Sequence, residues 1–81
     1  GYLVKNFSNK FMSQITNFFL NEQQYFTNKR ITIFDLINYF NYNNSLLVLE
    51  YNNLICNEKN WKQIIIENDD KIEIVTIVGG G

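Results

Sequence analysis

The sequence lacks the residues from which most catalytic and metal sites are built. It has no histidine, no proline and a single cysteine, Cys56, among 81 residues. One thiol cannot form an intramolecular disulfide, and without histidine it cannot complete the common zinc sites. With no histidine to activate it, Cys56 is expected to be a buried structural thiol rather than a nucleophile. The chain also has no Ser/His/Asp set and no phosphate-binding loop, so we predict that it is not an enzyme.

The chain further lacks a surplus of either charge and any long apolar run. Its formal net charge is −1, whereas nucleic-acid binding calls for an excess of lysine and arginine. No apolar stretch approaches the roughly 20 residues that a transmembrane helix requires. We therefore expect neither nucleic acid nor a membrane among its partners.

What is present suffices for one small folded domain of unusual composition. At 46% hydrophobic and 16% aromatic residues, the chain has enough apolar material to form a core. It contains fourteen asparagines and eleven isoleucines but no alanine and only one arginine. A strongly AT-rich coding sequence would produce this bias, so we predict a plastid-encoded protein of the stroma, with a bacterial cytoplasm as the alternative.

Residues 1–14 differ from the rest of the chain. Their apolar residues fall near helical spacing, with lysine and asparagine between them. We expect an N-terminal extension, helical or disordered, in preference to a helix that lies on a membrane surface. The folded domain is then predicted to span residues 15–78, followed by a flexible Gly-Gly-Gly tail at 79–81.

Several segments after residue 14 have the composition of β-strands. They are Ile15–Leu20, Gln24–Thr27, Leu46–Tyr51, the short Leu54–Cys56 and Lys71–Val78. The turns between them are rich in asparagine and aspartate, the residues other than glycine that best tolerate positive φ. In the last strand Ile72 and Ile74 fall on one face, whereas Val75 and Ile77 fall on the other.

One helix is predicted between the second and third of these strands. Thr32 followed by Asp35 resembles a capping box at its start. The apolar residues of its stripe are Ile33, Leu36, Ile37 and Phe40. Further along the chain, Trp61 is interpreted as a core anchor, and Asn68-Asp69-Asp70 as a solvated turn.

This order of elements predicts an α+β fold. A hairpin, one helix and later strands fit a ubiquitin-like β-grasp, a mixed sheet of four to five strands with one main helix packed on one face. A ferredoxin-like sandwich would need a second full helix, for which Trp61–Ile66 is too short.

Three glycines follow the last predicted strand. Without Cβ atoms they form a thin peptide that can enter a narrow channel, and Gly81 presents an unobstructed carboxylate. Joined to AMP as a mixed anhydride, such a carboxylate would react readily with a sulfur nucleophile to give a thiocarboxylate. Three glycines alone would equally suit a linker remnant, so the setting of the tail decides between these interpretations.

Four groups of residues share their type and spacing with a known family. They are Asn52-Asn53-Leu54-Ile55, Trp61, Asp70-Lys71-Ile72-Glu73-Ile74-Val75 and Val78-Gly79-Gly80-Gly81. From about Ile15 to the last residue the chain thereby resembles the ThiS family, the sulfur carriers of thiamine thiazole biosynthesis. Asn53 and Asp69 stand where that family commonly has glycine, and Cys56-Asn57 where it has Val-Pro. These departures leave the tail untouched.

The resemblance implies a carrier that is the substrate of other proteins. A ThiF-like adenylyltransferase would adenylate the Gly81 carboxylate, a cysteine desulfurase would supply sulfur, and thiazole synthase would accept it. No cofactor would be bound stably, and only a transient AMP adduct and a thiocarboxylate would form at Gly81. The residues expected to present the tail and dock partners are Val75, Ile77, Val78, Gly79 and Gly80. Ordinary packing is the alternative for Val75 and Ile77.

Three other functions fit the same sequence pattern. The small subunit of molybdopterin synthase is also a Gly-Gly thiocarboxylate carrier of this fold. A ubiquitin-like modifier joined to lysines would use the same tail. A plain β-grasp interaction module would leave the tail inert, since fold does not determine function.

Overall fold

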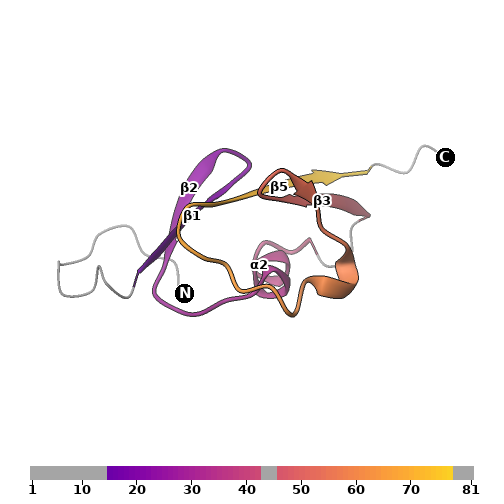
Figure 1. Cartoon of the computed structure of the whole chain (residues 1–81). Helices are drawn as coiled ribbons and strands as arrows, with labels where there is room; N and C mark the ends of the chain where they lie inside the picture. The colour runs from indigo at the N-terminus through magenta and orange to yellow at the C-terminus, as the bar shows by residue number, and fades with distance from the viewer. Residues whose placement is uncertain (1–14, 43–45, 78–81) are drawn as a thin grey trace.

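The computed structural model describes residues 15–42 and 46–77 as one sheet with one helix (Figure 1). The predicted extension at 1–14 and the tail at 79–81, together with Val78, lie outside the described residues. The strands are β1 (Thr16–Leu20), β2 (Gln23–Thr27), β3 (Leu47–Tyr51), β4 (Leu54–Ile55) and β5 (Asp70–Thr76). The helix α2 spans Ile33–Tyr39, and a short 3-10 turn, η1, spans Glu58–Asn60.

The sheet is mixed and its central strand is the last one in sequence. The strand order is β2-β1-β5-β3-β4, with β1 and β5 parallel and the other pairs antiparallel. Helix α2 packs on one face of this sheet and leaves the other face without a helix (Figure 1). The predicted ubiquitin-like β-grasp is confirmed.

Both hairpins use two-residue turns with positive φ at each central residue. Asn21 and Glu22 have φ of 48° and 68°, and Asn52 and Asn53 have φ of 52° and 72°. These values define type I′ turns, whose twist matches that of antiparallel strands. Asp69 has φ of 67°, so asparagine and aspartate do take the backbone conformation that glycine would favour.

Helix α2 begins as its sequence predicts. The Thr32 side chain accepts a hydrogen bond from the Asp35 backbone N–H at 3.1 Å, and an Asp35 carboxylate oxygen accepts one from the Thr32 N–H at 2.9 Å. Both bonds of the capping box are therefore formed. The helix ends at Tyr39, and the next residue, Phe40, is its C-cap rather than part of its last turn.

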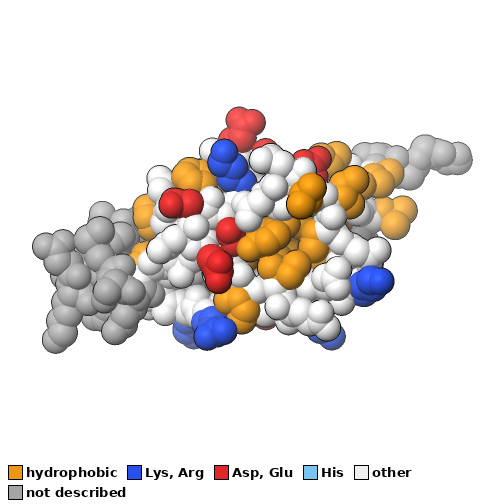
Figure 2. All heavy atoms as spheres, viewed as in Figure 1, with side chains coloured by type: hydrophobic (Ala, Val, Ile, Leu, Met, Phe, Trp, Pro, Cys, Tyr) orange, Lys and Arg blue, Asp and Glu red, His pale blue; other side chains and the backbone are white. Residues whose placement is uncertain are grey.

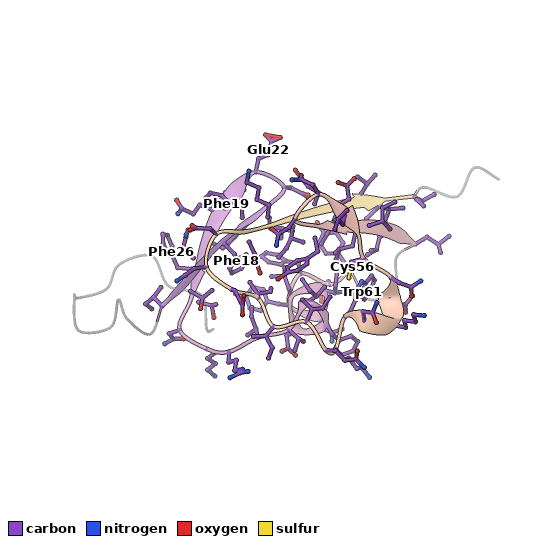
Figure 3. All side chains as sticks on the ribbon, in the orientation of Figure 1. Phe18, Phe19, Glu22, Phe26, Cys56 and Trp61 are labelled. Carbon is purple, nitrogen blue, oxygen red and sulfur yellow. The ribbon has the colours of Figure 1, made fainter. Side chains whose placement is uncertain are left out.

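The core lies between α2 and the sheet. Its fully buried apolar side chains are Phe18, Ile33, Leu36, Ile37, Leu49 and Ile72. Trp61 closes the end near η1, where it is only 8% exposed and its Nε1 donates to the Cys56 carbonyl oxygen at 3.3 Å (Figure 3). Trp61 is therefore the core anchor that the sequence predicts.

A candidate docking face beside the end of the last strand

Strand β5 divides its side chains between the core and the open face of the sheet. Ile72 and Ile74 point to the core and are 1% and 6% exposed. Val75 and Ile77 are 64% and 51% exposed. The alternation predicted for this strand is thus observed, and the two residues singled out for docking are accessible. Their role in docking stays a prediction.

Strand β3 adds two more apolar side chains beside them. Val48 pairs directly with Val75, and the Ile77 N–H donates to the Leu46 carbonyl oxygen at 2.7 Å, which continues the ladder past the end of β5. Val48 and Leu46 are both exposed. We call these four residues, Leu46, Val48, Val75 and Ile77, the outer patch. Figure 2 shows exposed hydrophobic side chains gathered at the end of the molecule where β5 ends.

Two carboxylates border the outer patch on the same face. Glu50 and Glu73 are directly opposite each other in the β3–β5 pair. They lie two positions along their strands from Val48 and Val75, and therefore on the same face of the sheet. Both are partly buried. No ion pair to either carboxylate is found within residues 15–42 and 46–77. The open face therefore combines an apolar surface with a pair of uncompensated negative charges.

The side chain of Asn21, in the turn of the β1–β2 hairpin, hydrogen-bonds to β5 where the pairing with β1 ends. The Asn21 N–H donates to the Ile72 carbonyl oxygen at 2.9 Å, and the Asn21 Oδ1 accepts from the Ile74 N–H at 2.8 Å. The side chain thus replaces a further residue of β1 in the ladder. Because the hairpin turns away here, β5 continues beyond it with β3 as its neighbour, toward residues 78–81.

The other end of β5 is fixed by Asp70. Its carboxylate accepts hydrogen bonds from the Tyr51 hydroxyl at 2.5 Å, the Asn52 Nδ2 at 3.1 Å and the Glu67 backbone N–H at 2.8 Å. The Lys71 N–H donates in turn to the Asn52 Oδ1 at 2.8 Å. Asp70 is 7% exposed, so the prediction of a solvated turn is wrong for this residue. A buried carboxylate requires such partners, and here they hold β5 in register against β3.

Cys56 lies away from the outer patch, at the end of β4 next to Trp61 (Figure 3). It is partly buried rather than fully buried as predicted. Burial raises the pKa of its thiol above the ordinary value, which lowers the fraction of reactive thiolate at neutral pH. The described residues contain no group of three or more metal-ligating side chains that could hold an ion. None of the helices among these residues is long and apolar enough to span a membrane.

The sequence predicted only two of the six residues that make up the outer patch and its bordering carboxylates. It identified Val75 and Ile77 from the alternation of the last strand but did not assign Leu46, Val48 or the two carboxylates. Strand β3 reads as nearly continuous apolar sequence, which conceals its alternation. The pairing register brings β3 beside β5, and no local sequence pattern indicates that register.

Comparison with known proteins identifies relatives over almost the whole chain. The model of the ThiS family matches residues 10–81. A protein named ycf40 from Trieres chinensis is 63% identical over 70 residues, which cover 86% of this chain and 96% of that protein. A ycf40 protein from Pyropia yezoensis is 31% identical over 62 residues, covering 76% of this chain and 87% of that protein.

A solved structure has the same fold. The thiamine biosynthesis protein ThiS from Geobacter metallireducens superposes with a TM-score of 0.68 and covers 82% of this chain and 100% of its own. Sequence identity in that superposition is 14%, so this similarity speaks for the fold alone.

Proposed function

Because this chain belongs to the ThiS family, we propose that it is a sulfur carrier protein for the biosynthesis of the thiazole of thiamine. The observation that carries this proposal is the extent of the family match, which runs through residue 81 and so includes the glycine tail. The carrier is a protein substrate rather than an enzyme, in keeping with its lack of histidine and of a catalytic cluster in the sequence.

The proposed chemistry takes place at the Gly81 carboxylate. Attack of a carboxylate oxygen on the α-phosphorus of ATP gives an acyl adenylate and releases pyrophosphate. A persulfide, supplied by a cysteine desulfurase, then attacks the acyl carbon and AMP leaves. A second thiol then attacks the donor-cysteine sulfur of the resulting acyl disulfide, so that a disulfide forms between these two cysteines and a thiocarboxylate is released on Gly81. This thiocarboxylate donates its sulfur to the thiazole in thiazole synthase. The carrier supplies the acyl group, and its partners supply the catalysis.

The outer patch suits the docking that this chemistry requires. Exposed apolar residues next to one another commonly mark protein–protein contacts. Val75 and Ile77 lie within the last residues of the chain before the tail, so a partner that holds Gly81 in its active site would be close to them. Val78, Gly79 and Gly80 would then cross from the docked domain to the reacting carboxylate. We propose a ThiF-like adenylyltransferase and thiazole synthase as the partners of this face.

The proposal also includes a location in the plastid stroma. It is supported by the composition expected of an AT-rich coding sequence and by the relatives named ycf40 from Trieres chinensis and Pyropia yezoensis.

Intact mass spectrometry tests the proposal. The full chain is incubated with ATP, a ThiF-like adenylyltransferase and a persulfide donor. We expect the mass gain that corresponds to the exchange of one oxygen for one sulfur, located at Gly81 by fragmentation. An unchanged mass, with an enzyme that charges its own carrier in parallel, would contradict the proposal.

Deletion of Gly81 provides the matched control. The shortened chain should fold as the full chain does, because the described core ends before the tail, but it should no longer be charged at the native position. Sulfur transfer from the charged full chain to thiazole synthase is then compared with its transfer to the large subunit of molybdopterin synthase. Turnover with the molybdopterin enzyme alone would replace the thiazole assignment by the molybdopterin one.

A further inference from the structure

The pair Glu50–Glu73 is an unusual feature of the open face. The two residues are directly opposite in antiparallel strands, so their Cβ atoms are about 4.5–5.5 Å apart. Their side chains leave the sheet on the face opposite α2, the same face as Val48 and Val75. Like charges at this spacing destabilise a strand pair. The pair therefore costs stability in the free protein.

Nothing in the described part of the chain neutralises this pair. The cation on the same face of β5 is Lys71, two residues from Glu73, and it makes no ion pair with either carboxylate. Glu22, at the tip of the β1–β2 hairpin, adds a further negative charge on this side of the sheet (Figure 3). Figure 2 shows acidic side chains along this upper face, adjoining the hydrophobic ones at its end. The face thus carries three carboxylates, Glu22, Glu50 and Glu73, and one lysine, Lys71, so negative charge predominates beside the apolar patch.

We propose that Glu50 and Glu73 together receive a cationic side chain, arginine or lysine, from the enzyme that adenylates Gly81, while the outer patch packs against apolar residues around that cation. A cation between the two carboxylates would remove their repulsion and form charge-assisted hydrogen bonds with both. An arginine suits this position because its planar guanidinium offers several N–H donors. This inference rests on the proposed function, since the outer patch leads directly into the tail.

Charge and position together favour this occupant. An anionic lipid surface or a nucleic acid would be repelled by this face, because its three carboxylates outnumber its single lysine, Lys71. The adenylating enzyme must recognise the carrier before any sulfur is attached, so it has to rely on the folded domain and not on the thiocarboxylate. Electrostatic complementarity of this kind accelerates association and selects the correct partner.

The test uses a double variant, Glu50→Gln with Glu73→Gln, in the full chain. Carrier-dependent ATP–pyrophosphate exchange by a ThiF-like adenylyltransferase is measured against carrier concentration at low and at moderate salt. We expect KM for the carrier to rise about ten-fold or more with kcat within about two-fold of wild type. The KM of wild type should rise with salt, whereas that of the variant should change much less. Thermal unfolding should show the variant to be at least as stable as wild type.

A charge-matched control separates the pair from net charge. Glu58→Gln with Glu67→Gln removes the same two charges from residues outside the β3–β5 pair, and its KM should stay within about two-fold of wild type. A wild-type KM for the Glu50/Glu73 variant, or an equal rise in both double variants, would overturn the inference and leave the carrier function intact. If wild type is not adenylated by an enzyme that charges its own carrier, the proposed function fails, and this inference fails with it.

Discussion

Asp70 ties together three parts of the chain that are distant in sequence. It stands at the start of β5, yet its hydrogen bonds come from the β3 residue Tyr51, from Asn52 in the following turn and from Glu67 in the preceding loop. Tyr51 and Asp70 are nineteen positions apart. Hydrogen bonds to a charged acceptor contribute about 1.5–3 kcal/mol each when formed. One residue thus fixes the position of the strand that leads to the tail.

The Tyr51 hydroxyl makes stability depend on alkaline pH. Burial, followed by the hydrogen bond to Asp70, raises the pKa of Tyr51 above its ordinary value of 10.0. The folded protein keeps this proton at pH values where the unfolded chain releases it. Its contribution to the free energy of unfolding is therefore complete below pH 10 and declines as the pH rises above that value.

We expect this decline to be steeper in wild type than in Tyr51→Phe. Urea unfolding between about pH 8 and pH 11 measures the slope for both proteins, and lysine titration, common to both, cancels in the comparison. Equal slopes would show that the pKa of Tyr51 is the same in the folded and the unfolded chain, and would contradict this prediction.

At the scale of the elements, both hairpins bear the cost of turns without glycine. The type I′ turn at Asn21-Glu22 places a glutamate at φ of 68°, a region that its Cβ disfavours. The turn still forms because Asn21 donates to Ile72 and accepts from Ile74, so its position is fixed by β5 as well as by the hairpin. Tertiary contacts therefore compensate for an unfavourable local conformation.

Replacing Glu22 with glycine should stabilise the protein. Glycine accepts positive φ without the Cβ clash but gains entropy in the unfolded chain, so we expect a net increase of about 0.5–1 kcal/mol in the free energy of unfolding. Chemical denaturation measures it, and Glu22→Ala, which keeps the Cβ, should show no gain. A loss of stability in Glu22→Gly would mean that the glutamate side chain itself supports the turn.

The elements could be predicted from sequence wherever their signal is local. The capping box at Thr32 was sufficient to predict where helix α2 begins. The alternation of apolar and polar residues in β5 was sufficient to predict which of them face the core. Asp70 could not be interpreted correctly, because the partners that bury it come from β3 and the turn after it. Glu50 and Glu73 were missed for the same reason, since only the pairing register makes them neighbours.

At the scale of the whole molecule, the single helix gives the sheet one covered face and one open face. Alternate residues of β5 are therefore buried in the core or exposed on the open face, and under the proposed function they serve stability and recognition respectively. Ile74 is packed into the core, and its neighbour Val75 is exposed in the outer patch.

Substitutions at these two neighbours should separate stability from recognition. Ile74→Ala should lower the free energy of unfolding by about 2–4 kcal/mol because it leaves a cavity. Val75→Thr keeps the β-branched shape, so its stability should stay within about 0.5 kcal/mol of wild type. Only Val75→Thr should raise KM for adenylation, with both proteins assayed at a temperature where they are folded. A raised KM in neither variant would place the docking surface elsewhere.

The position of β5 at the centre of the sheet also governs how the domain can be made. During translation, β1, β2, α2, β3 and β4 leave the ribosome before the strand that joins them. Phe18 of β1 can pair with Asp70 of β5 only after the ribosome has added more than fifty further residues to the chain. Without β5, the hairpin and β3 share no backbone pairing, so the sheet cannot form as one unit until β5 is released. Folding of this domain is therefore completed after synthesis of its last strand, and an interrupted chain would expose core residues rather than form a shorter domain.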